Sequence, residues 1–139
     1  MHAADLLTNR SRLTPDRDAL LTLPGGQSYT YAELNARANR LANWMRTLGV
    51  EKGDRISVLA HNGIEYLDLF YGLAKIGAIL APLNWRLVAR ELVYIVNDCQ
   101  PKVLICGPEF SDVLAEMRPE IEVAHHVGVQ GAKFLSLIH

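Results

Sequence analysis

The pair Trp85-Arg86 places an aromatic ring beside a guanidinium, directly after the apolar run Ala78–Leu83. The run is typical of a strand, and loops that follow strands often carry binding residues. An aromatic face and a cation could together form the edge of a ligand site. They could also anchor the packing of the domain, which is the simpler of the two interpretations.

Histidines are the next candidates for chemistry. His61 follows the strand-forming run Arg55–Ala60, and ligands of open α/β sheets bind at the carboxyl ends of strands. No nucleophile or carboxylate stands beside it in the sequence, so we interpret His61 as a turn residue that could in principle contact a ligand. His125-His126 lie in a strand-like segment, where neighbouring side chains point to opposite faces. We do not expect that pair to chelate one metal ion.

The remaining candidates have structural explanations. Gly72 and Gly77 have the spacing of a phosphate-binding loop, but Ala78-Ile79 follow where that motif requires Lys and then Ser or Thr. We therefore expect a helix-packing glycine and a helix stop. Asp54-Arg55 and Glu91 fall at element boundaries or on a helix face, where solvated charges are ordinary.

Size and composition indicate a globular protein. The 139 residues fit one domain, half of them are hydrophobic and 21% are charged. The formal net charge of −1 gives no electrostatic reason to expect a nucleic acid or an anionic membrane as partner. The longest apolar stretch, Ile76–Leu83, falls far below the ~20 residues that span a bilayer. With no secretory signal pattern, we expect a cytoplasmic protein without integral membrane contact.

The two cysteines are too few for a disulfide framework. Cys99 and Cys106 have no Cys-x-x-Cys spacing, so a redox or zinc site has little support. We expect both to serve as small apolar residues of the fold.

Residues 18–34 predict a β-hairpin followed by the start of a helix. Two short extended runs, Ala19–Leu23 and Ser28–Thr30, flank a Pro-Gly-Gly turn. Thr30 and Glu33 form a capping-box pattern, after which apolar residues recur at helical spacing until Gly49. The other face of this helix is expected to be solvated, although a binding patch stays open; it carries Asn35, Arg37, Asn39, Arg40, Asn43 and Arg46.

Residues 54–129 predict βα repeats. Strands are expected at 55–60, 78–83, 102–106 and 121–129, and helices at 64–76, 89–97 and 108–117. The run 78–83 is so uniformly apolar that we expect a strand covered on both faces. Strands that alternate with helices predict an α/β fold, with a parallel βαβ sheet, flanking helices and the N-terminal β-hairpin.

An ordered set of segments resembles the acyl-CoA synthetases of the AMP-forming, adenylate-forming ligase superfamily. The resemblance covers most of the chain. Its segments are 30–35 (Thr-Tyr-Ala-Glu-Leu-Asn), 38–42 (Ala-Asn-Arg-Leu-Ala), 48–55 (Leu-Gly-Val-Glu-Lys-Gly-Asp-Arg), 77–84 (Gly-Ala-Ile-Leu-Ala-Pro-Leu-Asn) and 91–98 (Glu-Leu-Val-Tyr-Ile-Val-Asn-Asp). Within the superfamily, Pro82–Leu87 resembles the acyl- and aryl-CoA ligases more than the amino-acid adenylation domains. The resemblance thus implies a fatty or aromatic acid as substrate.

The resemblance implies that residues 1–139 are the first part of the large N-terminal AMP-binding domain. The intact enzyme would use ATP, Mg²⁺ and CoA to convert a carboxylic acid into an acyl adenylate and then a CoA thioester. We expect the phosphate-loop region and the C-terminal domain to be absent. No position of this chain matches a catalytic, cofactor-binding or metal-binding motif of the family, so none is assigned.

We therefore expect the chain alone to be inactive and to bind none of these cofactors tightly. An alternative is a stand-alone, non-catalytic interaction module, a truncated relative whose exposed edges and apolar faces would lead to self-association. A flavodoxin-like nucleotide binder fits the βα alternation but lacks a phosphate loop, and it ranks last.

Overall fold

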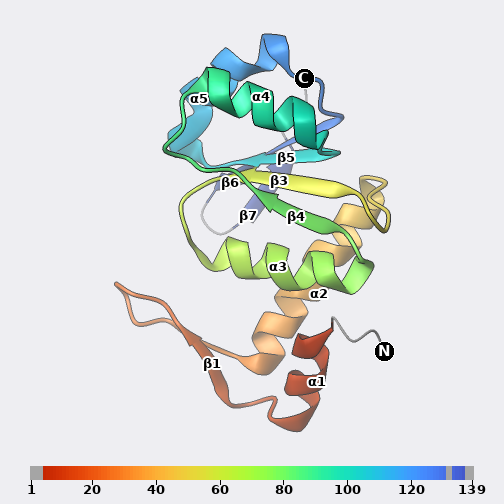
Figure 1. Ribbon diagram of the computed structural model, residues 1–139. Coiled ribbons are helices and arrows are strands. Elements are labelled where there is room, and N and C mark those ends of the chain that lie inside the picture. Colours follow the sequence, from red (N-terminus) through yellow and green to blue (C-terminus); the bar gives the residue numbers. More distant parts are fainter. Residues whose placement is uncertain (1–4, 131–132, 137–139) are drawn as a thin grey trace. The chain divides into compact units, whose positions relative to one another are not determined.

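The computed structural model describes residues 5–130 and 133–136 (Figure 1). Its contacts divide the chain into two compact units. The first holds the described residues up to Glu51 together with Ile64–Gly77. The second holds Lys52–Gly63 together with the described residues from Ala78 onward.

The first unit consists of three helices and a two-stranded antiparallel hairpin. The elements are α1 (Leu6–Leu13), β1 (Asp18–Leu21), β2 (Ser28–Thr30), α2 (Tyr31–Thr47) and α3 (Ile64–Ile76). The hairpin and the bounds of α3 confirm the sequence-based expectation. Helix α1 was not predicted, because Leu7 is its one buried residue and the apolar spacing that reveals a helix is missing.

Helix α2 begins and ends where its local signals predict. The Thr30 backbone N–H donates to Glu33 Oε2 at 2.8 Å, and the Glu33 N–H donates to Thr30 Oγ1 at 3.2 Å. These two bonds complete a capping box, which satisfies donors that the first turn of a helix leaves free. Gly49 follows the last turn with φ of 79°, a left-handed conformation that glycine adopts without a Cβ penalty.

Helices α2 and α3 approach each other closely at Gly72. A Cβ added there would lie 2.7 Å from Leu41 Cδ2 and 3.0 Å from the Ala38 carbonyl oxygen. The glycine is thus a packing residue, as expected from the missing Lys and Ser of a phosphate loop. Gly77 has φ of 72° after the end of α3, which confirms the expected helix stop.

The second unit is built on a five-stranded sheet with the order β4-β3-β5-β6-β7. The first four strands in that order are parallel, and β7 pairs antiparallel with β6. The strands are β3 (Arg55–Leu59), β4 (Ile79–Pro82), β5 (Val103–Cys106), β6 (His125–Gln130) and β7 (Lys133–Ser136). Ile56 in the central β3 aligns with Leu80 on one side and with Val103 on the other. The α/β class and its parallel sheet are therefore confirmed.

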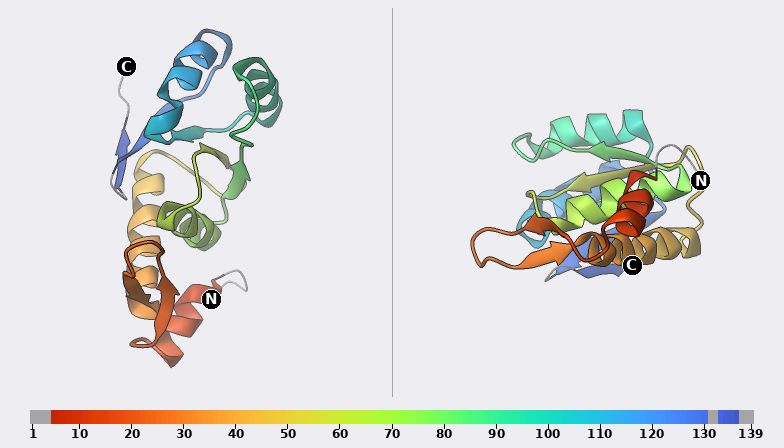
Figure 2. Two further views of the ribbon diagram at one scale, coloured as in Figure 1. Left: turned by 90° about the vertical axis from the view of Figure 1, so that its left-hand side faces the viewer. Right: turned by 90° about the horizontal axis from the view of Figure 1, so that it is seen from below.

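Helices α4 and α5 lie on the same face of this sheet (Figures 1 and 2). The helical elements are α4 (Ala89–Cys99), η1 (Pro108–Phe110), α5 (Ser111–Met117) and η2 (Arg118–Glu120). One core joins the helices to the strands: Leu92 of α4 and Met117 of α5 are fully buried in the same cluster as Leu59 and Leu104. Gln100 ends α4 in the left-handed conformation with φ of 50°, directly before Pro101.

Two expectations about the sheet differ from the structure. Strand β4 is an edge strand, and both Ile79 and Pro82 are exposed, so it is not covered on both faces. Pro82 can occupy this strand because proline lacks the N–H that a central strand must donate. The last predicted strand starts later, at His125, since 121–124 has no ladder partner, and the antiparallel β7 was not predicted.

Candidate functional site

Four side chains gather at the carboxyl ends of three neighbouring parallel strands. The His61 and Trp85 rings meet edge to face with centroids 4.5 Å apart, and the His61 and Phe110 centroids are 5.0 Å apart. The Trp85 and Phe110 centroids lie 6.3 Å apart, and the Arg86 guanidinium carbon sits 4.9 Å from the Trp85 ring centroid. We call His61, Trp85, Arg86 and Phe110 the carboxyl-edge cluster.

The parallel topology brings these residues together. His61 follows β3, Trp85 and Arg86 follow β4, and Phe110 follows β5. Since parallel strands end at one edge of their sheet, loops far apart in sequence meet there. This edge is where open α/β sheets bind ligands.

Exposure separates the base of the carboxyl-edge cluster from its outer surface. Phe110 is 8% exposed and belongs to the core under α4 and α5. Trp85 is 41% exposed, and His61 and Arg86 are also exposed. A buried ring therefore supports two exposed rings and a cation. Both interpretations of Trp85-Arg86 are compatible with this geometry, because the ring packs and still faces solvent.

The guanidinium and the aromatic surface define what this edge can bind. A guanidinium presents a planar fork of N–H donors that matches phosphate and carboxylate oxygens, and its positive charge strengthens those hydrogen bonds. An exposed indole offers a flat apolar face for a ring or an acyl group. The cluster can thus bind a ligand that carries an anionic group beside a flat or apolar one.

The other charged candidates have structural partners in the second unit. Lys102 Nζ forms an ion pair with Asp54 Oδ2 at 3.2 Å, and the Arg55 Nε donates to the Cys99 carbonyl oxygen. Glu91 Oε2 accepts from the Val88 N–H at 3.1 Å at the start of α4. Each of these interactions gives the charged residue a structural role that requires no ligand, as expected for charges at element boundaries.

Cys99 and the histidine pair of β6 are not part of the carboxyl-edge cluster, and Cys106 belongs to the same buried core as Phe110. Cys106 is buried in the core, where burial, reinforced by the charge of Glu109, raises its pKa to about 11. Cys106 is thus an apolar core residue, since a thiol with so high a pKa carries almost no thiolate at neutral pH. His125 and His126 occupy adjacent positions of β6 and leave the strand on opposite faces.

The polar face of α2 is only partly solvated, which corrects the expectation for two of its six residues. Asn39, Arg40, Asn43 and Arg46 are exposed as predicted. Arg37 instead binds the buried Asp68 of α3 with two hydrogen bonds, Nε to Oδ1 at 2.9 Å and Nη2 to Oδ2 at 2.6 Å. The hydrogen bond to Asp68 raises the pKa of Arg37, so the guanidinium stays charged despite partial burial.

Asn35 belongs to a second polar network around Lys75 of α3. The Lys75 ammonium donates to Asp5 Oδ1 at 2.9 Å, to Thr8 Oγ1 at 2.6 Å and to Asn35 Oδ1 at 2.8 Å. These three acceptors match the three donors of an ammonium. The network joins α1 to α2 and α3, so we assign it a role in holding these helices together. Sequence reasoning missed it, because nothing local marks Lys75 as buried.

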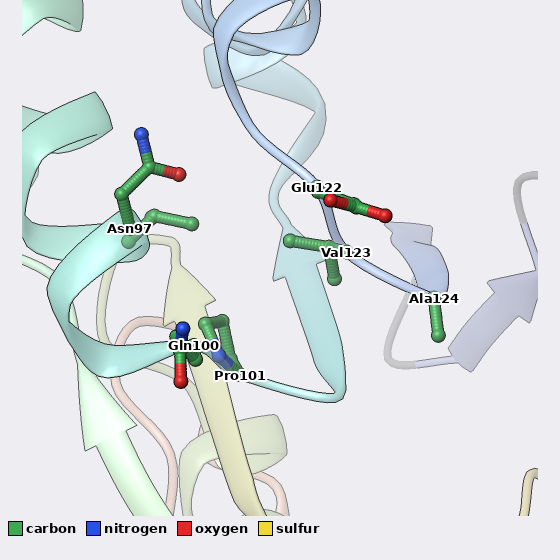
Figure 3. Close-up of a pocket in the computed structure, with 7 residues that line it drawn as sticks. Asn97, Gln100, Pro101, Glu122, Val123 and Ala124 are labelled. Atoms are coloured by element: carbon green, nitrogen blue, oxygen red, sulfur yellow. The ribbon is translucent and has the colours of Figure 1, made fainter.

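A pocket of about 750 Å³ lies at the other end of the sheet in the second unit (Figure 3). Asn97 and Gln100 approach it from the end of α4, and Glu122 and Val123 approach it from the segment before β6. It is formed at the amino ends of β5 and β6, away from the edge where such sheets bind ligands. The Asn97 amide already donates to the Glu120 carbonyl oxygen at 3.0 Å, so we assign the pocket no ligand.

Sequence reasoning missed Phe110 of the carboxyl-edge cluster and also Asn84, whose Oδ1 accepts from the Arg86 N–H. The signal for Phe110 was its place soon after a strand, like Trp85, but its helix-like surroundings concealed it. The signal for Asn84 was its position directly before Trp85-Arg86, where asparagine commonly forms turns.

In the part of the chain that the structure describes, no helix is both long and apolar enough to cross a membrane.

Known proteins resemble the chain along most of its length. Residues 7–136 match the model of the family described as AMP-binding enzyme. The chain is 38% identical over 117 residues to the long-chain-fatty-acid–CoA ligase FadD13 of Mycobacterium tuberculosis, a match that covers 84% of the chain and 23% of that relative. It is 39% identical over 108 residues to a feruloyl-CoA synthase of Amycolatopsis, covering 78% of the chain and 22% of that relative.

A solved structure has the same fold. The chain superimposes on the N-terminal domain of FACL13 from Mycobacterium tuberculosis with a TM-score of 0.86 and 35% sequence identity, covering 93% of the chain and 34% of that structure. A largely parallel sheet with helices packed against it defines an α/β protein. The chain belongs to the AMP-binding enzyme family. It spans about a quarter of the length of the curated relatives above and corresponds to their N-terminal domain region.

Proposed function

We propose that the chain is part of an AMP-forming acid–CoA ligase, which activates a carboxylic acid with ATP and passes the acyl group to CoA. The observation that carries the proposal is the carboxyl-edge cluster. There an exposed indole and a guanidinium stand at the end of a parallel sheet, where α/β proteins bind ligands. ATP and CoA both carry phosphates that a guanidinium can bind, next to a flat adenine ring.

A fatty or aromatic acid is the substrate class that we propose. Two observations support it: the sequence Pro82–Leu87, and relatives that are named for a long-chain fatty acid and for a feruloyl group. By its resemblance, Pro82–Leu87 is more similar to the acyl- and aryl-CoA ligases than to the amino-acid adenylation domains.

Magnesium would neutralise phosphate charge in such an enzyme. Within residues 5–130 and 133–136, no three His, Cys, Asp or Glu side chains lie close enough together to hold a metal ion. We therefore assign no residue of this chain to magnesium and derive no step through it. The contribution that we propose for the chain is scaffold and one ligand edge.

The proposal has a direct test in carboxylate-dependent exchange between ATP and pyrophosphate. We expect no exchange above blank with the 139-residue chain, because its sequence contains no Ser/Thr/Gly-rich loop with a lysine to hold the phosphates. The polypeptide that extends the chain to the length of its relatives should show exchange with fatty or aromatic acids, and should form a thioester when CoA is added. Exchange by the short chain would disprove its inactivity, and none by the long one would disprove the ligase.

The alternative is a non-catalytic interaction module. Large apolar side chains are exposed in both units, including Leu23 of the hairpin and Tyr94 of α4. Such residues can mark surfaces that bind partners. Size-exclusion chromatography with light scattering distinguishes the two functions: a module should self-associate, and a monomer that binds no hydrophobic dye would exclude that role.

We predict that Arg86→Ala weakens binding of a phosphate-bearing cosubstrate in the extended polypeptide. Hydrogen bonds to charged groups contribute about 1.5–3 kcal/mol, so the KM for that cosubstrate should rise about 10- to 160-fold. Measuring the KM for ATP, for CoA and for the acid separately identifies which ligand reaches this edge. The KM values for the other two substrates should change little.

Arg90→Ala is the matched control for Arg86→Ala. Arg90 is an exposed arginine in the first turn of the neighbouring α4, so its removal changes the net charge by the same amount. Unchanged KM values in Arg90→Ala would show that the effect of Arg86 is local. If Arg86→Ala also leaves every KM unchanged, Trp85-Arg86 is a packing anchor rather than a ligand edge.

A further inference from the structure

The loop from β4 to α4 is held at both ends by hydrogen bonds. At its start, the Leu83 N–H donates to the Val58 carbonyl oxygen of β3 at 2.9 Å. At its end, the Val88 N–H donates to Glu91 Oε2 in the first turn of α4 at 3.1 Å. These two anchors place the loop at the carboxyl end of the sheet. They do not by themselves set the direction of the residues between them.

Asn84 controls the backbone inside this loop. Its side-chain Oδ1 accepts from the Arg86 N–H at 3.1 Å, and its carbonyl oxygen accepts from the Leu87 N–H at 3.1 Å. A side chain that binds the backbone two residues further on forms an Asx turn, which stabilises one of several possible loop conformations. Trp85 lies inside that turn and Arg86 closes it.

The conformation of this turn determines where the Arg86 guanidinium lies. The Arg86 guanidinium carbon lies 4.9 Å from the centroid of the Trp85 ring. Trp85 is in turn held by the rings of His61 and Phe110. The position of the guanidinium thus depends on the Arg86 backbone and on the Trp85 ring, and both residues belong to the turn that the Asn84 side chain stabilises.

Asn84 contributes little to the stability of the folded protein. The residue is exposed and lies outside the buried core of the second unit. Losing its one neutral side-chain hydrogen bond should lower the free energy of unfolding by no more than about 1.5 kcal/mol, a small part of the ~5–15 kcal/mol of a typical domain. An effect of Asn84 on ligand binding would therefore not reflect loss of folded protein.

We infer that Asn84 is a positioning residue, which holds Trp85 and Arg86 in the geometry that binds the phosphate-bearing cosubstrate. The inference rests on the proposed function of the carboxyl-edge cluster. Asn84 acts through the Arg86 backbone and need not contact the ligand. Asn84 has neither a charge nor an aromatic ring, so its effect on binding comes entirely from pre-organisation of the loop.

Two substitutions of Asn84 test this inference. In Asn84→Ala the acceptor oxygen is lost, and in Asn84→Asp an oxygen remains at the same position. A single neutral hydrogen bond is worth about 0.5–1.5 kcal/mol, so we expect Asn84→Ala to raise the KM for the affected cosubstrate about two- to tenfold. Because a carboxylate beside Arg86 would itself repel a phosphate, Asn84→Asp is compared through amide exchange rather than KM, and kcat should change little in Asn84→Ala.

A double variant and amide exchange distinguish positioning from a general structural role. If Asn84 acts through Arg86, Asn84→Ala should add almost nothing to the KM of Arg86→Ala, because coupled residues are not additive. In the 139-residue chain, NMR should show the Arg86 amide hydrogen exchanging about two- to tenfold faster in Asn84→Ala than in wild type or Asn84→Asp. An unchanged exchange rate of this hydrogen in Asn84→Ala would contradict the claim that the Asn84 side chain stabilises the turn.

The outcomes separate this inference from the proposed function. If Arg86→Ala raises the KM and Asn84→Ala does not, the ligand edge stands and the role of Asn84 is overturned. An equal rise in the KM values for all substrates in Asn84→Ala would also overturn it, since that result indicates a general structural defect. If Arg86→Ala changes no KM, the proposed edge fails, and the inference about ligand positioning fails with it.

Discussion

Replacing Arg37 with Met should lower the free energy of unfolding by about 3–5 kcal/mol, because the variant leaves a buried carboxylate without its cation. The Asp68 side chain is 6% exposed and that of Arg37 is 18% exposed, so water reaches the carboxylate only slightly. The two parallel hydrogen bonds of 2.6 and 2.9 Å are the fork-to-carboxylate geometry in which such pairs are strongest. Urea-induced unfolding of the 139-residue chain measures this change.

Arg40→Met is the matched control for Arg37→Met. Arg40 lies on the same helix and is exposed, so its replacement should change the free energy of unfolding by no more than about 0.5 kcal/mol. The double variant Arg37→Met with Asp68→Leu should recover much of the loss, because replacing both members of a buried ion pair with apolar residues is often neutral. Equal stability of Arg37→Met and Arg40→Met would contradict the assignment.

Lys75→Met should cost about 2–3 kcal/mol of stability. Met keeps the apolar stem, but Asp5, Thr8 and Asn35 lose a shared donor. The expected cost lies below the ~3–5 kcal/mol typical of fully buried pairs, since the Asp5 side chain keeps 21% exposure and is partly solvated. Lys52→Met, which removes an exposed lysine, is the control and should be close to neutral.

The stability difference between wild type and Lys75→Met should depend on pH. Burial alone would raise the pKa of Asp5, but the hydrogen bonds from Lys75 and Thr8, with the charge of Lys75, outweigh burial and lower that pKa below its usual 3.8. A lowered native pKa stabilises the fold above the unfolded value and loses that stabilisation as pH falls through the native value. The two proteins should therefore differ fully at neutral pH and converge below about pH 4. A difference that grows in acid would refute the role of Asp5.

Elements marked by local signals were predictable from the sequence. Thr30 and Glu33 sit three residues apart, which is enough to specify the first turn of α2. The ends of three helices are also marked by residues next to them in the sequence: a glycine follows α2 and α3, and Gln100-Pro101 follows α4. Helix α1 and strand β7 were missed, because α1 buries a single residue and β7 depends on pairing with β6.

The carboxyl-edge cluster shows where local reasoning stops. Trp85-Arg86 and His61 were recognisable as candidates by residue type and by their place after strands. Their contact with each other and with Phe110 depends on the parallel order of β4, β3 and β5, which brings three separate loops to one edge. No spacing within one loop predicts such a contact.

The sequence by itself determined the family, the α/β class, the positions of most helices and strands, and the candidate pair Trp85-Arg86. Only the tertiary structure decided which polar residues are buried and which rings meet. Arg37 and Asp68 are 31 positions apart, and Asp5 and Lys75 are 70 positions apart. Capping and periodicity act over a few residues, whereas burial of a charge depends on chain segments that only folding brings together. That is why a polar face that looked uniformly solvated holds two buried charge networks.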